Sequence, residues 1–207
     1  MRVKCFHLGA YGTNCFLAYD ENNIAYFFDC GGRNLDKLYS YIEEHNLDLK
    51  YIVLTHGHGD HIEGLNDLAD KYPEAKVYVG EEEKDFLYNS ELSLSYNIFG
   101  DSFKFKGEVQ TVKEGDMIGD FKVIDTPGHT IGSKCFYDEK SKILISGDTL
   151  FRRSYGRYDL PTGDLNMLCN SLEKLSKLPE ETVVYSGHTE ETTIGEEKKF
   201  LERVGIL

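Results

Sequence analysis

The sequence predicts an α/β sandwich built from mixed β-sheets. Short apolar runs typical of strands come in groups, near the N-terminus and again from residue 121 onward. Helical patterns lie between these groups instead of alternating strictly with single strands, which argues against a doubly wound parallel sheet. The 207 residues contain no evident linker, tandem repeat or low-complexity tract, so we expect a single domain over 1–207.

The first half of the chain should contain five strands and two helices. Asn34 is expected to cap the first helix, and the second should run along 65–72, with Pro73 directly after it. The strands are recognised by alternating or continuous apolar residues between turn-forming ones. They are expected at 3–8, 13–19, 24–30, 51–54 and 76–79.

The second half returns to strands and ends on a helix. Asp164 is expected to cap a helix, and Thr193 with Glu196 has the spacing of a capping box for the last one. The segment 81–107 is polar and rich in turn residues. It reads equally well as a loop or lid beside a site and as a surface excursion. Strands are expected at 121–125, 133–138, 143–146 and 182–185.

The charge balance excludes some partners. The formal net charge is −13, which disfavours nucleic acid and anionic membranes because both require clustered Lys and Arg. The N-terminal residues show no secretion signal, and no apolar run has the length of a membrane span. We therefore expect a cytoplasmic protein whose partner is a small molecule.

Cysteine and two of the histidines are expected to be structural. The five cysteines are scattered and form no C-x-x-C pair, so reduced thiols are expected, not disulfides or a cysteine zinc site. His7 lies in the first strand. His45 lies in the last turn of the first helix, where a cation suits the helix dipole.

The stretch from Thr55 to His61 has the composition of a metal site. It follows the predicted strand at 51–54 and reads T-H-G-H-G-D-H, with three imidazoles and one carboxylate. These groups are preferred ligands of divalent metals. His56 and His58 are two residues apart, so an extended backbone directs both to the same side.

Three late strands also end in ligand-type residues. The strands at 121–125, 143–146 and 182–185 lead into His129, Asp148 and His188, each with glycine directly before it. If these strand ends share one sheet edge, the ligands converge there. Seven candidate ligands are too many for one ion and suit two ions that share a carboxylate. The seven are His56, His58, Asp60, His61, His129, Asp148 and His188.

This ligand pattern resembles the metallo-β-lactamase superfamily. H-x-H-x-D-H followed by isolated His, Asp and His at strand ends covers essentially the whole chain. The resemblance implies a four-layer αββα sandwich of two mixed sheets flanked by helices. It also implies that one metal is bound by His56, His58 and His129, that the other is bound by Asp60, His61 and His188, and that Asp148 bridges the two.

Three further segments resemble the glyoxalase II (hydroxyacylglutathione hydrolase) group. These are 147–151 with the turn at 128–130, and the segment 154–161, which is similar to small single-domain bacterial members. The resemblance implies a thioesterase. Two divalent ions, zinc first with iron or manganese as alternatives, would share a bridging hydroxide that attacks the acyl carbonyl. Asp60 and Asp148 would be the catalytic carboxylates.

Several assignments stay open at this point. Arg152, Arg153 and Arg157, with Tyr155, are candidates for substrate binding, and the arginines suit a carboxylate as well as they suit ordinary salt bridges. Asp29 could orient a metal-bound histidine or serve as a plain turn residue. A mononuclear iron persulfide dioxygenase using His56, His129 and Asp148, or a lactonase or phosphodiesterase, would use the same residues.

Overall fold

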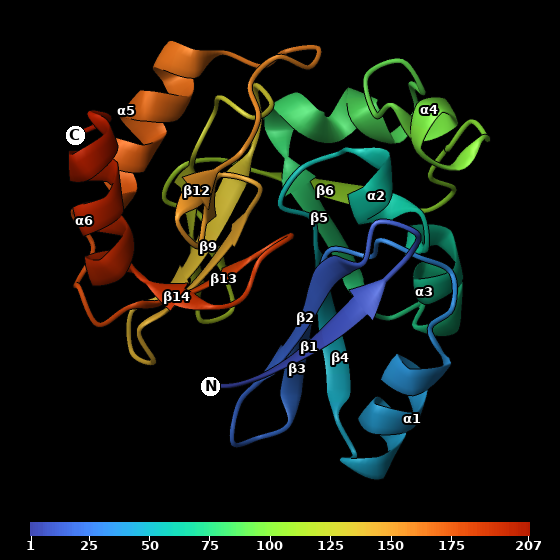
Figure 1. The fold of residues 1–207 in the computed structure, drawn as a ribbon. Helices are drawn as coiled ribbons and strands as arrows, with labels where there is room; N and C mark the ends of the chain where they lie inside the picture. Colours follow the sequence, from blue (N-terminus) through green and yellow to red (C-terminus); the bar gives the residue numbers. More distant parts are fainter. The chain divides into compact units, whose positions relative to one another are not determined.

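The computed structural model describes all residues from 1 to 207. They form two compact units, Met1–Thr111 and Val112–Leu207. Each unit is built around one six-stranded sheet with helices beside it (Figure 1). No helix combines the length and the apolar character that crossing a bilayer would require.

The first sheet is mixed. Strands β1, β2 and β3 pair antiparallel in chain order, whereas β3, β4 and β5 run parallel. Every residue of β2 is buried, as expected for a strand covered on both faces. The order is β1-β2-β3-β4-β5-β6, with bounds Arg2–Leu8, Thr13–Tyr19, Ile24–Phe28, Asp48–Val53, Lys76–Gly80 and Val109–Val112.

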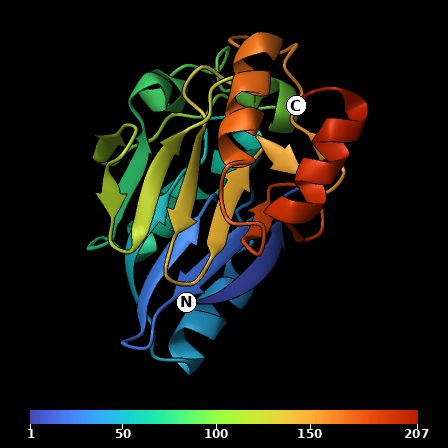
Figure 2. The same cartoon turned by 90° about the vertical axis from the view of Figure 1, so that its left-hand side faces the viewer.

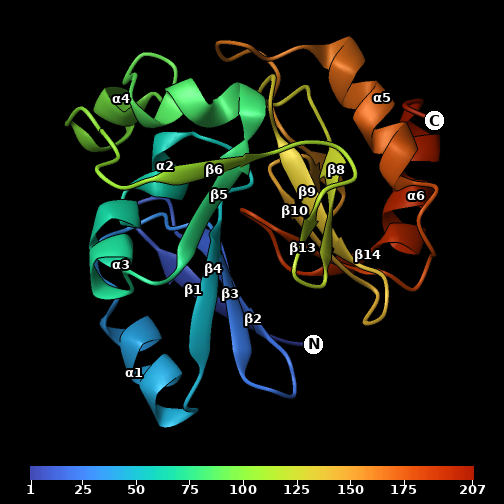
Figure 3. The same cartoon turned by 180° about the vertical axis from the view of Figure 1, so that it is seen from behind.

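Helices α1 (Asp36–Glu44) and α3 (Leu65–Lys71) lie along one side of the first sheet (Figure 3). Their leucines join the strand residues in one buried cluster. The predicted cap at Asn34 is wrong, because Leu35 is the N-cap residue and no side chain caps the helix. Leu35 is almost fully buried in the core, and this places the start of the helix at Asp36.

The second sheet brings three strand ends to one edge. Strand β10 runs parallel to β13, and β9 lies antiparallel between β10 and β8. Strands β8, β10 and β13 therefore point the same way, and their carboxyl ends share one edge of the sheet. The order is β14-β13-β10-β9-β8-β7, with bounds Thr192–Thr193, Val183–Ser186, Ile143–Gly147, Lys134–Asp138, Phe121–Asp125 and Met117–Ile118.

Helices α5 (Leu165–Leu175) and α6 (Ile194–Val204) lie side by side along the second sheet (Figure 2). Both predicted caps are present: Asp164 accepts a hydrogen bond from Met167 N at 2.8 Å, and Thr193 accepts one from Glu196 N at 3.3 Å. A short hairpin, β11 (Leu150–Phe151) and β12 (Ser154–Tyr155), follows β10. The sequence did not predict this hairpin or the short strands β6, β7 and β14.

Candidate metal centre

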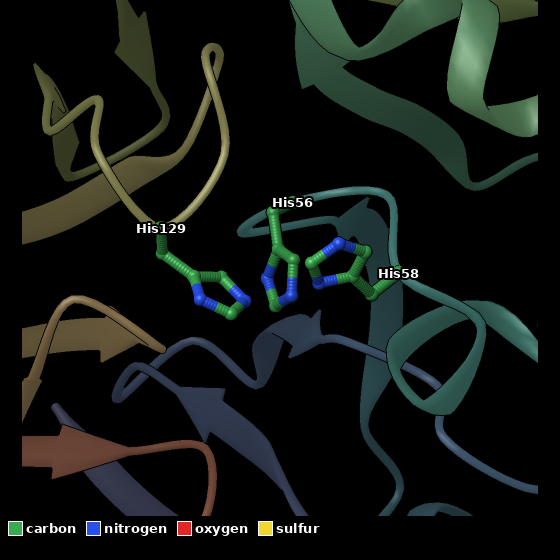
Figure 4. Close-up of side chains that lie close together, drawn as sticks. All are labelled: His56, His58 and His129. Atoms are coloured by element: carbon green, nitrogen blue, oxygen red, sulfur yellow. The ribbon is translucent and has the colours of Figure 1, made fainter. Parts of the chain in front are cut away.

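The loop after β4 presents the candidate ligands of the first unit. His56, His58 and His61 are almost fully buried. The rings of His56 and His58 are perpendicular, with centroids 4.8 Å apart. Figure 4 shows both rings on this loop and draws His129 on the loop that follows β8. Asp60 and His61 lie on the short helix α2 (Gly59–Ile62), with Asp60 Oδ2 at 3.8 Å from His61 Nε2.

The side chain of Asp29 is hydrogen-bonded to this loop. Its carboxylate is 2% exposed and accepts three hydrogen bonds at 2.8 Å, from the backbone N and the hydroxyl of Thr55 and from His61 Nδ1. The residue has a φ of 61°, a left-handed conformation that Asp tolerates better than most residues do. Of the two interpretations of Asp29, the structure therefore supports contact with a ligand histidine.

The second unit presents its ligands at one sheet edge. His129, Asp148 and His188 follow β8, β10 and β13, as the strand pattern predicted. Asp148 Oδ2 lies 3.8 Å from His129 Nε2 and 3.4 Å from His188 Nε2. A single carboxylate oxygen thus faces the imidazoles that follow the other two strands, β8 and β13.

These separations suit ligands of a common ion. They exceed the 2.7–3.2 Å of a good N–H···O hydrogen bond. Two donors that each lie about 2.0–2.2 Å from a tetrahedral zinc ion are roughly 3.3–3.6 Å apart. The 3.4 Å pair of Asp148 and His188 falls within that range, and the two 3.8 Å pairs lie just beyond it.

The Nδ1 atoms of three histidines face oxygen atoms. His61 Nδ1 donates to Asp29, His129 Nδ1 donates to the Arg157 carbonyl at 2.7 Å, and His56 Nδ1 lies 3.1 Å from Thr55 Oγ1. Since the Thr55 hydroxyl donates to Asp29, its oxygen accepts from His56. Each ring is thereby held in the tautomer that directs the Nε2 lone pair toward a metal. The donor set of imidazoles and carboxylates fits a divalent cation.

Cysteine does not contribute to either ligand set. All five thiols are free, which agrees with the sequence expectation. Burial raises the pKa of Cys15 and Cys30 well above the ordinary value and raises the pKa of Cys135 to about 11. These thiols are protonated at neutral pH, whereas a nucleophile or a metal ligand must be a thiolate.

The four residues suggested for substrate binding separate in the structure. Tyr155 packs against the core of the second unit. Arg157 lies next to the ligands through its carbonyl, and its guanidinium forms a bidentate pair with Asp159 at 2.8 and 2.9 Å. Arg152 and Arg153 occupy the hairpin tip and line a different cavity, of about 470 Å³, against α6.

The segment 81–107 is packed beside the histidine loop. Glu83, on the 3₁₀ helix η1 (Glu81–Leu87), accepts a hydrogen bond from Gly57 N at 2.8 Å, and Ser93 O accepts one from Gly59 N at 2.7 Å. This matches the alternative that places the segment next to a site. Sequence reasoning missed Glu83, because nothing distinguishes it from the acidic residues directly before it.

Comparison with known proteins identifies the family. The model of the Metallo-beta-lactamase superfamily matches residues 8–188, and so covers every candidate ligand. The chain belongs to the metallo-β-lactamase superfamily. Its two mixed sheets with flanking helices are those of the metallo-β-lactamase α/β sandwich. The chain is therefore a member of a metallo-hydrolase superfamily that binds divalent metals.

Three similar proteins span nearly the same length as this chain. Hydroxyacylglutathione hydrolase GloC of Haemophilus influenzae is 33% identical, with 96% of each chain covered. The crystal structure of BLEG-1 B3 metallo-beta-lactamase is 35% identical with a TM-score of 0.88, covering 96% of this chain and 97% of that one. The structure of TTHA1623 in a di-iron-bound form is 32% identical with a TM-score of 0.86, covering 95% and 98%.

Proposed function

We propose that the protein is a binuclear metal-dependent thioester hydrolase of the hydroxyacylglutathione hydrolase type. The observation that carries the proposal is the position of Asp148, whose Oδ2 faces both His129 and His188. A carboxylate in that position is suited to bridge two ions. One ion would be held by His56, His58 and His129, the other by Asp60, His61 and His188, with Asp148 between them.

The chemistry follows from the ligand types. When bound, the two divalent ions would supply a water that ionises near neutral pH and a Lewis acid for the acyl carbonyl. Asp60 and Asp148 would supply the carboxylate ligands at the reacting centre. Asp29, Thr55 and the Arg157 carbonyl hold the imidazoles in the required tautomer. The protonated buried cysteines fit a reaction that uses no protein nucleophile.

The proposed substrate is a small acyl thioester. Support comes from GloC, which carries the name hydroxyacylglutathione hydrolase and aligns over nearly its whole length. Arg157 would bind a substrate carboxylate by exchanging it for Asp159, since both offer the same bidentate geometry. Arg152, Arg153 and Tyr155 would then not contact the substrate. They would affect Arg157 only through the position of the β11–β12 hairpin that precedes it.

The test is turnover of S-lactoylglutathione by metal-free protein and by protein reloaded with zinc, manganese or iron. We expect turnover only after metal is restored, and we expect His58→Ala to lose both metal and turnover. Unchanged turnover by metal-free His58→Ala would refute the proposal. Similar activity with zinc and manganese would leave the native metal to be read from the purified protein.

A second candidate activity is β-lactam hydrolysis. The similarity to BLEG-1, a B3 metallo-beta-lactamase, favours it, because the same metal chemistry opens an amide ring. Turnover of a chromogenic cephalosporin in the same assay separates this candidate from the thioesterase. Oxygen uptake with glutathione persulfide would distinguish the persulfide dioxygenase alternative from the thioesterase. The similar protein TTHA1623 was solved in a di-iron-bound form, so iron-loaded protein is included in this assay.

A further inference from the structure

We propose that Glu83 is a positioning residue for two metal ligands, His56 and His58, and that it acts through the backbone amide of Gly57. The inference rests on the proposed metal site but not on the thioesterase reaction. Glu83 lies on η1, outside the H-x-H-x-D-H motif, and is fully buried.

The contact falls midway between the two ligands. Glu83 Oε2 accepts a hydrogen bond from Gly57 N at 2.8 Å. Gly57 is the only residue between His56 and His58, so the plane of its peptide sets the direction from which both imidazoles project. A hydrogen bond to a carboxylate is shorter and stronger than one between neutral groups, and it holds that peptide firmly.

The backbone approaches η1 too closely for any side chain at position 57. A Cβ added to Gly57 would collide with Phe86, the residue one helical turn after Glu83. Successive side chains of an extended backbone point to opposite sides. His56 and His58 therefore project to the side opposite position 57, with the His58 ring still 6.3 Å from the ring of Phe86, and the glycine between them allows Glu83 to reach the amide.

The same arrangement is repeated two residues later. Gly59 N donates to Ser93 O at 2.7 Å, and a Cβ on Gly59 would lie 2.9 Å from Ser95 Cα. Gly57 and Gly59, the two glycines of the ligand motif, thus both donate backbone hydrogen bonds to the segment from 81 to 99. Ser93 contributes a backbone carbonyl, which substitution cannot remove, whereas Glu83 contributes a side chain, which substitution can.

A buried carboxylate needs compensation. Burying the charge of Glu83 is unfavourable unless hydrogen bonds or nearby positive charge offset the lost hydration. The Gly57 amide supplies a hydrogen bond, and a cation bound by His56 and His58 would supply positive charge close to the same loop.

The experiment compares zinc affinity across four variants of the full chain. Glu83→Met keeps the volume and removes the strong acceptor, Glu83→Ala removes both, and Glu83→Gln keeps an acceptor oxygen. Glu81→Ala is the matched control, an exposed acid on the same helix. Chelator competition on metal-free protein should show zinc affinity about 10–100-fold weaker for Glu83→Met and Glu83→Ala. Glu83→Gln should recover most of it, and Glu81→Ala should match the wild type.

Two further readouts separate positioning from general support of the fold. The absorption spectrum of the cobalt-loaded protein reports ligand geometry and should change in Glu83→Met but not in Glu81→Ala. Thermal unfolding of the metal-free variants reports the fold. Wild-type zinc affinity in folded Glu83→Met, or a Glu83→Gln variant as impaired as Glu83→Met, would overturn the inference. If the wild-type protein binds zinc but does not cleave thioesters, the proposed function fails and the role of Glu83 stands.

Discussion

The two ligand sets are built in different ways. In the first unit, His56, His58, Asp60 and His61 come from one six-residue stretch at the end of a single strand. In the second unit, His129, Asp148 and His188 are 59 residues apart from first to last (188 − 129), and parallel strands bring them to one sheet edge. Local sequence specifies the first set, and sheet topology specifies the second.

The support behind the ligands differs in the same way. His61 is oriented by a side chain, the buried carboxylate of Asp29. His129 is oriented by a backbone carbonyl, that of Arg157. The first set should therefore be sensitive to single side-chain substitutions outside the motif, and the second set to changes that move the backbone. The predictions below test this difference.

The largest effect is expected from Asp148→Asn. An amide is a poor metal ligand, so the shared position would be lost, and we expect fewer than two ions per chain. Turnover should fall roughly 10³-fold, because several kcal/mol of Lewis-acid stabilisation depend on the ions. Metal analysis and steady-state kinetics measure both. Asp164→Asn is the control, since Asn caps a helix as well as Asp does. Two bound ions and normal turnover in Asp148→Asn would contradict the bridging role.

A smaller loss is expected from Asp29→Asn. Asn tolerates the left-handed backbone of this position, and its oxygen still accepts from Thr55. Its NH₂ group, however, faces His61 Nδ1 as a second donor and disfavours the required tautomer. Zinc affinity should fall about 10–100-fold. The exposed Asp48→Asn serves as control. Equal zinc affinity in Asp29→Asn and Asp48→Asn would show that Asp29 does not orient His61 for metal binding.

The backbone-dependent set is probed by Gly156→Ala. A Cβ at this position would collide with the Asp148 carbonyl oxygen and lie 3.4 Å from the Cβ of His129. Accommodating it must move the base of the β11–β12 hairpin, at a cost of about 1–3 kcal/mol in unfolding free energy. Urea unfolding of the metal-free protein measures that cost. Unchanged stability together with unchanged zinc affinity would show that the second set does not depend on this backbone.

The smallest effect is expected from thiol modification. Because burial raises the pKa of Cys135 to about 11, only about 0.1% of it is thiolate at pH 8. The pKa values of Cys15 and Cys30 are raised as well. Iodoacetamide should leave these three thiols unmodified at pH 8 in the folded protein, and their labelling should increase as the pH rises toward 11. Mass spectrometry gives the labelled sites. Rapid labelling at pH 8 with loss of metal would point to thiolate ligands.

The sequence was most informative where ligands adjoin strands. The motif from His56 to His61 and the three late candidate ligands were chosen from residue type and from the short apolar strand before each, and the structure confirms those strands. The first helix start was misplaced by one residue. Burial of Leu35, a tertiary effect, determines that start, and local capping preference at Asn34 does not.

What the sequence could not supply were contacts between distant segments. Glu83 meets Gly57 across 26 positions, and Asp29 meets His61 across 32. Arg152, Arg153 and Arg157 are close in sequence, yet a hairpin places the first two against α6 and leaves Arg157 by His129. Proximity along the chain predicted a cluster there, and the strand pairing of the hairpin separated it.

The central claim is that the two ligand sets together hold a pair of ions. X-ray absorption of the zinc-loaded wild-type protein, with the zinc content measured on the same sample, tests it most directly. We predict two zinc ions per chain, coordinated by nitrogen and oxygen without sulfur, with metal–metal scattering at about 3.5–4 Å. One ion per chain, sulfur ligation, or two ions without metal–metal scattering would contradict the account.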